Sequence, residues 1–386
     1  MQRGITPFFG GRSTLWSAWS PRPTAEELRG WPPELIGTLQ EYFPHAEELL
    51  SVLPADEIKD RTSALRQGGS IYGTLQESLT RMLRDGAGNV PSATRVSAAP
   101  LAAAAFDRQG MDFHKFSTPP RFLSLFQRQR RLAETGQGAP LKIVTNCVVQ
   151  RILDSGGRAT ALETSRGTLP LGNARVILAM GTLPVTTLVM NSFPEIRNAG
   201  RRYSAHFLSS LVARVPREDF SFCHRLNDLE LAAIYVAGAE QKDGGQYHIQ
   251  LTALADKHPA ANAATANRYM PDSLATASLE QLMTSTSHIL FACAVVGELD
   301  HRNPQNWFKR NEECDDPAAN MVLQVTPNDR DRTVWNTMEE ATFQALERVL
   351  SPGGPVRIEY WRRGEGAESW QRGRPSIQEM RASALF

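Results

Sequence analysis

The sequence predicts a mixed α/β (α+β) protein that is built from helical and strand-rich regions. Three observations support this class. Helical patterns dominate residues 25–90, a further helix is expected at 119–135, and strand-like segments separated by glycine turns dominate from residue 141 onward. The chain has 386 residues, of which 41% are hydrophobic, so it can bury the core of two domains or of one large two-layered unit.

The first third of the chain is expected to be helical between two loops. Residues 1–24 are rich in glycine, serine and tryptophan and predict an extended loop. Hydrophobic residues then recur at helical spacing, and Pro44 is expected to end or kink that helix. The residues of this helical face are Leu35, Leu39, Phe43, Leu49 and Leu50. A second helix is expected at 74–84, and the composition of residues 86–100 indicates a loop.

The pattern changes after the helix at 119–135, where two prolines precede the start and two glycines follow the end. Strands are expected at 141–149, 158–164 and 168–171, with Gly156-Gly157 in the first turn. The apolar run 174–180 predicts a strand buried on both faces. Gly181 ends that run, and a helix at 183–190 follows, which is a geometry that presents helix amides to an anionic group.

The last half of the chain predicts a mostly antiparallel sheet with long polar loops. Strands are expected at 208–215, 231–237, 247–253, 289–296, 321–325 and 356–361. Residues 333–350 predict the clearest helix, because Trp335, Met338, Phe343 and Leu346 fall near one face.

Composition excludes several classes of protein. The 42 basic and 41 acidic residues give a net charge of +1, without the basic excess of a nucleic-acid binder. The four cysteines are far apart in the sequence and form no CxxC pair; they are Cys147, Cys223, Cys293 and Cys314. We therefore expect reduced thiols, and we expect neither a metal site nor a disulfide framework. No apolar run reaches about 20 residues, and the N-terminus has no signal-peptide core. We therefore expect a soluble cytoplasmic protein without a membrane or nucleic-acid partner.

Three segments carry the chemistry. The first is the loop Gly10-Gly11-Arg12-Ser13-Thr14-Leu15-Trp16, where glycines allow a ligand to approach the backbone closely. The second contains Val149 and the run from Ala179 through Gly181 to Thr186. The third runs from Asn198 and Gly200 to His206. In this order and spacing they resemble the glucose–methanol–choline oxidoreductases and their pyranose-oxidase-like relatives.

The resemblance implies FAD as cofactor and assigns cofactor contacts residue by residue. Gly10, Gly11, Arg12, Ser13, Thr14 and Trp16 would line the pyrophosphate and the flavin ring, Val149 would hold the adenine, Ala179, Gly181 and Thr186 would close over the cofactor, and Asn198, Gly200 and His206 would lie near the flavin. Pyranose-oxidase-like members attach the flavin through a histidine between threonine and tryptophan. Leu15 takes that place here, so the resemblance implies a non-covalent flavin.

The chain departs from the family at both ends. The nearest string to the family's G-x-G-x-x-G motif is Gly86-Ala87-Gly88-Asn89-Val90-Pro91, which follows a helical pattern and has proline where the third glycine should be. No histidine follows His301, so the family's C-terminal catalytic base has no counterpart and no catalytic residue is assigned.

The expected organisation is a partial FAD-binding region of glucose–methanol–choline type (1–24 and 115–206), a helical and loop insertion (25–114), a substrate region on the antiparallel sheet (207–375) and a tail (376–386). The implied reaction is oxidation of an alcohol carbon of a sugar, a simple alcohol or a natural-product intermediate by hydride transfer to flavin. The alternative is a truncated or degenerate homologue that acts as a non-catalytic binding or interaction protein.

Overall fold

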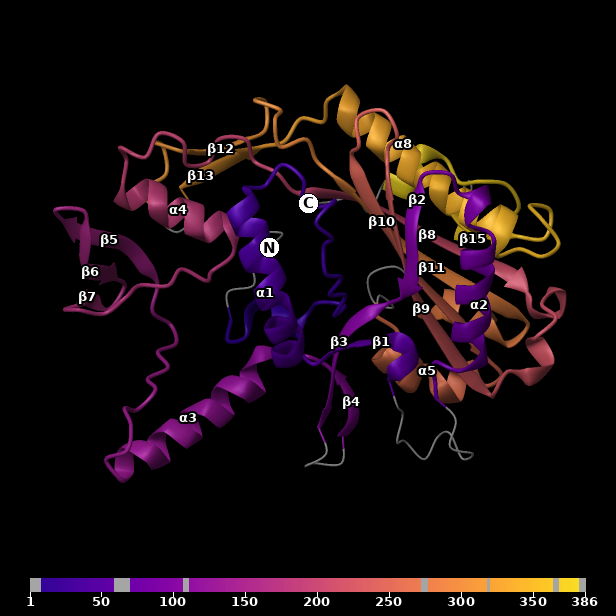
Figure 1. Ribbon diagram of the computed structural model, residues 1–386, viewed down its shortest axis with the longest axis horizontal. Helices are drawn as coiled ribbons and strands as arrows, with labels where there is room; N and C mark the ends of the chain where they lie inside the picture. The colour runs from indigo at the N-terminus through magenta and orange to yellow at the C-terminus, as the bar shows by residue number, and fades with distance from the viewer. Residues whose placement is uncertain are drawn as a thin grey trace. The chain divides into compact units, whose positions relative to one another are not determined.

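The computed structural model describes residues 8–58, 70–106, 111–271, 277–317, 320–363 and 368–381. It contains helices and mostly antiparallel sheets, which confirms the mixed α/β class. The chain forms two compact units (Figure 1). Unit 1 comprises Met1–Thr118, His206–Glu298 and Asp329–Phe386, and unit 2 comprises Pro119–Ala205 and Leu299–Asn328.

A seven-stranded sheet organises unit 1, and each of its ladders is antiparallel. In sheet order its strands are β15 (Glu368–Gln371), β14 (Glu359–Arg363), β8 (His206–Pro216), β11 (His288–Glu298), β10 (Gln246–Asp256), β9 (Leu229–Ala239) and β2 (Ala93–Ala98). The four central strands β8, β11, β10 and β9 confirm the sequence prediction, because long apolar segments with period-two alternation are typical of half-buried and buried strands. β14 begins at Glu359, three residues later than expected.

Both faces of this sheet are covered by helices. On one face, Phe207 of β8 stacks on Trp335 of α8 (Asp329–Gln344), with ring centroids 4.5 Å apart. Side chains alternate along a strand, so Val212 of β8 lies on the opposite face. Val212 belongs there to a buried cluster with Tyr269 of α5 (Pro259–Tyr269). In Figure 1, α8 and α2 (Thr74–Asp85) lie on the side of the sheet drawn to the right.

The expected loop at 86–100 is wrong, since it contains β2 and a short 3-10 turn, η3 (Ala87–Asn89). The strand exists because it pairs with β9, from Ala93 opposite Gly238 to Ala98 opposite Ile234. The glycine and proline residues around this segment are typical of a loop, so the sequence pattern did not predict the strand. The strand that pairs with it, β9, lies more than 130 residues away in the sequence.

The rest of unit 1 consists of a small sheet, α1 and short helical turns. The small sheet has the order β1 (Val52–Pro54), β3 (Pro100–Phe106) and β4 (Met111–Lys115). Helix α1 (Pro33–Leu50) continues through Pro44, so the proline does not end it as one expectation had it. The turns and short helices are η1 (Gly11–Thr14), η2 (Ala55–Glu57), η4 (Arg217–Asp219), η5 (Cys223–Arg225), α7 (Leu279–Leu282), η6 (Met283–Thr286) and α9 (Ile377–Arg381). The predicted helix at 333–350 is α8 followed by a π-helical turn, η7 (Ala345–Val349).

Unit 2 begins with α3 (Thr118–Glu134), as predicted. It contains the antiparallel sheet β5 (Val149–Ser155), β6 (Arg158–Thr164) and β7 (Gly167–Pro170), the helix α4 (Thr182–Ser192), and the pair β12 (Trp307–Arg310) and β13 (Met321–Gln324). The predicted turn at Gly156-Gly157 is confirmed, since both glycines have left-handed backbone angles.

Two predicted strands of unit 2 are wrong. Residues 141–148 and 174–180 join no strand ladder in the described part of the chain. Ile177, which was expected to be buried on both faces, is 86% exposed. A strand is stable only when a neighbouring strand takes its backbone hydrogen bonds, and an apolar run does not supply that neighbour.

The units divide the chain at points other than the expected regions, because residues 25–114 pack in one unit with residues 206–298. The assignment of cofactor and substrate regions remains a prediction. Among the helices that the structure describes, none is long and apolar enough to cross a membrane.

Candidate functional site

The residues proposed from the sequence are divided between the two units. Unit 1 holds the loop Gly10–Trp16 and His206, and unit 2 holds Val149, Ala179, Gly181, Thr186, Asn198 and Gly200.

The loop in unit 1 turns sharply at two glycines. Gly10 has φ 97° and Gly11 has φ 55°, which is the left-handed region that favours glycine. No atom lies within 4 Å of the position that a Cβ on Gly11 would take. Backbone conformation therefore calls for glycine at this position, and open space lies beside the backbone.

Side-chain hydrogen bonds hold this loop in place. Ser13 Oγ donates to the carbonyl of Gly10 at 2.7 Å and accepts from the backbone N–H of Thr118 at 3.0 Å. Trp16 Nε1 donates to the carbonyl of Phe116 at 2.7 Å. Two of these three bonds join residues about 100 positions apart, so the loop has a defined geometry although η1 itself is only four residues long.

His206 is the first residue of β8, and Arg12 of the glycine loop acts on it electrostatically. Partial desolvation, followed by the positive charge of Arg12, lowers the pKa of His206 below its usual value. The imidazole of His206 is therefore neutral at neutral pH, and the positive charge of Arg12 in the glycine loop acts on it.

A second histidine, His248 on β10, accompanies His206. Burial lowers the pKa of His248 to about 4, with further contributions from His206 and Arg95. The amide Nε2 of Gln250 lies 3.1 Å from His248 Nε2. An amide nitrogen is a donor, so this contact makes His248 Nε2 the acceptor and places the proton of the neutral ring on Nδ1.

Tyr235 and Arg95 complete this polar group. Tyr235 of β9 lies opposite Gln250, and the centroids of the Tyr235 and His248 rings are 5.2 Å apart. Arg95 lies over the Tyr235 ring, with its Cζ 5.2 Å from the centroid of that ring. Burial raises the pKa of Tyr235 to about 12, so its hydroxyl remains protonated. Arg95 Nη2 is 3.2 Å from a carboxylate oxygen of Glu27. We call His206, His248, Gln250, Tyr235 and Arg95 the polar face of the sheet.

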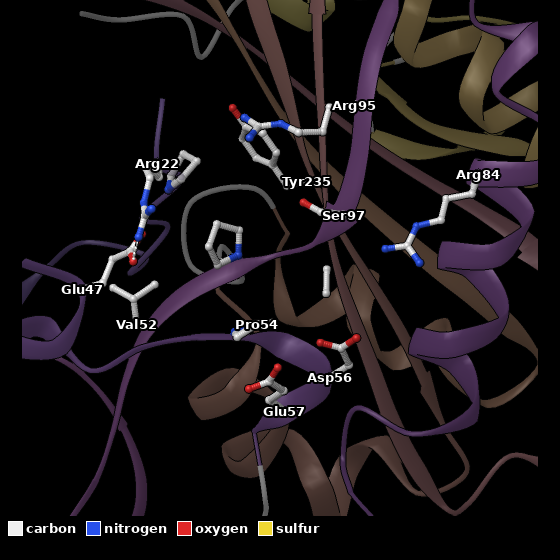
Figure 2. A pocket seen from close by; sticks show the side chains of 13 residues that line it. Arg22, Glu47, Val52, Pro54, Asp56, Glu57, Arg84, Arg95, Ser97 and Tyr235 are labelled. Atoms are coloured by element: carbon white, nitrogen blue, oxygen red, sulfur yellow. Dashed lines mark hydrogen bonds and ion pairs between the residues drawn. The ribbon is translucent and has the colours of Figure 1, made fainter. Parts of the chain in front are cut away.

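The polar face continues into a cavity of about 470 Å³ within unit 1. Figure 2 shows Tyr235 and Arg95 on one side of it and Asp56 and Glu57 on another. Arg22, a further lining residue, donates from Nε to Glu47 at 2.8 Å. The cavity thus presents hydroxyl, guanidinium and carboxylate groups, which suit a polar ligand with several hydrogen-bonding groups better than an apolar one.

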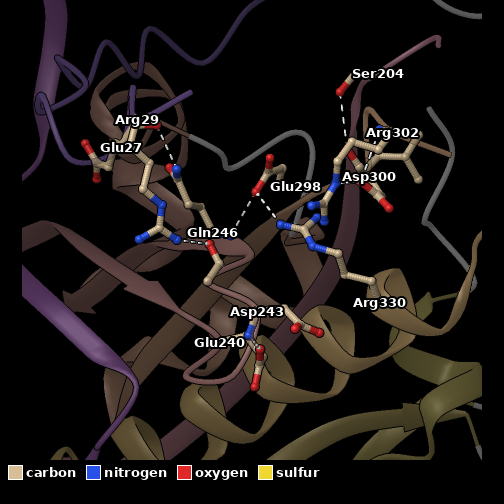
Figure 3. A network of polar contacts seen from close by, with 12 residues as sticks. Glu27, Arg29, Ser204, Glu240, Asp243, Gln246, Glu298, Asp300, Arg302 and Arg330 are labelled. Atoms are coloured by element: carbon tan, nitrogen blue, oxygen red, sulfur yellow. Dashed lines mark hydrogen bonds and ion pairs between the residues drawn. The ribbon is translucent and has the colours of Figure 1, made fainter. Parts of the chain in front are cut away.

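A hydrogen-bond network fixes the end of the sheet beside His248 (Figure 3). The backbone N–H of Gln246 donates to Glu298 at 3.1 Å, and the Gln246 side chain donates to the carbonyl of Glu27 at 2.7 Å. Arg330 Nη2 lies 3.5 Å from the same carboxylate of Glu298. The segment that carries Glu27, the partner of Arg95, is thereby tied to β10 and β11.

In unit 2, Gly181 precedes α4 with φ 85° and ψ 166°, angles that are essentially restricted to glycine. No side chain caps this end of α4, and Gly181 has open space where a Cβ would lie. Thr186 Oγ donates to the carbonyl of Thr182 at 2.8 Å, so its hydroxyl is satisfied within the helix. Val149 opens β5, and Ala179 is exposed.

Gly200 has a structural reason to be glycine. Its φ is 73°, and a Cβ there would collide with the carbonyl oxygen of Phe308. The N–H of Phe308 donates to the carbonyl of Gly200 at 2.8 Å. Close packing of two backbones explains this glycine without a ligand. Asn198, two residues earlier, is exposed.

Sequence reasoning missed four residues of the polar face: Arg95, Tyr235, His248 and Gln250. A signal was present, because Tyr247, Ile249 and Leu251 are buried and alternate with His248 and Gln250. Strict alternation places His248 and Gln250 together on one face of a strand. Among the described residues, no group of three or more His, Cys, Asp or Glu side chains could hold a metal ion.

Comparison with known proteins adds no relative. No protein-family model matches the sequence, and no curated protein matches it significantly.

Proposed function

We propose that this chain contributes flavin and substrate contacts to an oxidoreductase of the glucose–methanol–choline type, which oxidises an alcohol carbon and binds FAD non-covalently. One observation carries the proposal. The loop with the left-handed glycines Gly10 and Gly11 has open space beside its backbone at Gly11, and it belongs to the same unit as the neutral histidines His206 and His248. The positive charge of Arg12 in this loop lowers the pKa of His206 further. The resemblance of the loop, Val149, Ala179–Thr186 and Asn198–His206 to the family's motifs, in the same order, supports it.

The residues of the loop are compatible with FAD. Gly11 leaves its backbone open to a flat or phosphate-bearing group, and Arg12 supplies positive charge for an anionic one. Within unit 2, Gly181 leaves the uncapped start of α4 open to an anionic group. When bound, FAD would supply the hydride acceptor for oxidation of the alcohol carbon.

The polar face supplies the groups that would handle the alcohol. A neutral imidazole accepts hydrogen bonds from hydroxyl groups, so His206 is suited to receive the hydroxyl proton of the substrate. The acceptor nitrogen of His248 is already bonded to Gln250, so His248 is suited to support the site rather than to take that proton. Tyr235 keeps its proton and can donate a hydrogen bond to a substrate oxygen. The several polar groups of the neighbouring cavity favour a polyhydroxylated alcohol, such as a sugar, over a simple one.

Flavin binding is the direct test. The purified chain is expected to show flavin absorption or to take up added FAD, and acid denaturation is expected to release all of the flavin, because Leu15 cannot bond to it. Gly11→Val is expected to weaken FAD binding at least about tenfold, since a β-branched side chain is disfavoured at φ 55° and fills the open side of the loop.

Gly88→Val is the matched control, because Gly88 also has open space around it but no left-handed backbone. Equal FAD affinity in the two variants would contradict the role of the loop. A folded chain that neither contains nor binds FAD would overturn the proposal and leave the alternative, a non-catalytic binding protein.

A further inference from the structure

Two parallel stripes of side chains run along the outer surface of α1. Leu35, Tyr42 and Leu49 recur every seven residues and are 38%, 58% and 60% exposed. Seven residues make about two helical turns, so these three side chains lie in one line along the helix. Glu34, Glu41 and Glu48, each one position earlier, form a second line at the same interval, and all three are exposed. We call the six residues the α1 stripe.

The described residues of unit 1 leave the apolar side chains of this stripe exposed. The other large apolar residues of α1, which are Ile36, Leu39, Phe43 and Leu50, are partly buried, and the helix packs on β1 and β3. Leu35, Tyr42 and Leu49 lie at the outer margin of that apolar surface. A single exposed leucine is ordinary on a protein surface. Three large apolar side chains at heptad spacing instead supply one of the two apolar positions per heptad that form a helix-to-helix seam.

Charge decides which helix can occupy the seam. Helix α1 carries four glutamates and neither lysine nor arginine. Glu47 is paired with Arg22, whereas Glu34, Glu41 and Glu48 have no ion-pair partner among the described residues. A second copy of α1 in parallel register would place carboxylates against carboxylates, which disfavours self-association.

We propose that the α1 stripe binds a basic amphipathic helix of a partner protein, with the apolar side chains of that helix on Leu35, Tyr42 and Leu49 and its lysines or arginines on the glutamates. Charged residues flanking an apolar seam set partner choice in this way in coiled coils. The 18 residues of α1 span about 27 Å, so the partner needs two to three heptads.

The test uses the full chain and two synthetic three-heptad peptides. Both have leucine at the two seam positions of each heptad, and they carry either lysine or glutamate at the flanking positions. Fluorescence anisotropy with a labelled peptide is expected to show saturable binding of the lysine peptide, weakened by salt, and at least about tenfold weaker binding of the glutamate peptide.

Variants of the chain locate the contact. The pair Glu41→Lys and Glu48→Lys is expected to lower affinity for the lysine peptide at least about tenfold and to raise affinity for the glutamate peptide. Tyr42→Ala with Leu49→Ala is expected to weaken both. These side chains are exposed, so the variants keep the wild-type circular dichroism spectrum and unfolding transition. The pair Glu312→Lys and Glu313→Lys, at two exposed residues of unit 2, is the charge-matched control.

Three results would overturn the proposal. They are equal affinity for the two peptides, affinity that the stripe variants leave unchanged, and concentration-dependent self-association of the peptide-free chain that the stripe variants abolish. The last result, measured by sedimentation velocity, would assign the stripe to a second copy of the chain. None of these results depends on whether the chain binds FAD.

Discussion

Replacing His248 should change how the stability of unit 1 depends on pH. Burial, then the charges of His206 and Arg95, lower the pKa of His248 from 6.5 to about 4 in the folded protein. The unfolded chain lacks these effects, so it binds a proton at higher pH than the folded chain does. The neutral ring therefore costs nothing above the unfolded pKa, and stability is lost as the pH falls from about 6.5 toward 4.

The size of the effect follows from the pKa difference. A difference of about 2.5 units corresponds to about 3 kcal/mol of unfolding free energy, which is lost once the pH is below both pKa values. By about pH 5 the loss reaches roughly 2 kcal/mol, because the unfolded chain is then almost fully protonated at this position and the folded chain is not.

The assay is urea unfolding of the wild type and His248→Gln at about pH 7.5 and about pH 5. The variant has no titrating group at this position, so its stability should fall by roughly 2 kcal/mol less than that of the wild type over this range. His206 remains in both proteins, so its own burial and the charge of Arg12 act on it in both. His224→Gln, at an exposed histidine of η5, controls for the loss of a histidine. An identical fall in stability for wild type and His248→Gln would refute the reasoning.

Three further predictions concern packing and reactivity. Gly200→Ala should lower the unfolding free energy of unit 2 by about 2–3 kcal/mol in urea titrations. The reason is that the new Cβ collides with the carbonyl oxygen of Phe308 at a left-handed backbone position. A loss no larger than that caused by alanine at a glycine with open space around it would contradict this prediction. Glu339→Ala should cost about 2–3 kcal/mol in the same assay and Glu339→Gln less, since the buried carboxylate accepts from Arg381 at 2.7 and 2.8 Å and its removal leaves that guanidinium without a carboxylate partner. Equal losses for the two variants would argue against the ion pair. Cys293 is fully buried and burial raises its pKa to about 12, so alkylating reagents should label it only after denaturation, as read by peptide mapping. Labelling of the folded protein at about pH 7 at the rate of an exposed thiol would show that β11 is open to solvent.

Local sequence patterns predicted the elements whose type and boundaries depend mainly on their own residues. The segments 208–215, 231–237, 247–253 and 289–296 became β8, β9, β10 and β11, because each carries enough apolar side chains to be buried on at least one face. Helix α3 was predicted with boundaries correct to one residue, since prolines and glycines mark its ends in the sequence.

Pairing decided what local patterns could not. Ala174–Met180 has the more apolar sequence but forms no strand in the described structure, whereas Ala93–Ala98, with Arg95 and Ser97 in it, forms the edge of the main sheet. The difference is a partner: β9 offers its backbone to β2, and no described strand does so for the apolar run. Backbone hydrogen bonds between distant segments cannot be read from the composition of either segment.

By itself the sequence determined the mixed α/β class, the four long strands of the main sheet and the glycine loop Gly10–Trp16, because apolar periodicity and glycine geometry are local properties. Only the tertiary structure brought His248, Tyr235 and Arg95 onto one face of the sheet. It also decided which side of α1 stays in solvent, since burial and electrostatic environment depend on chain segments that are far apart in sequence.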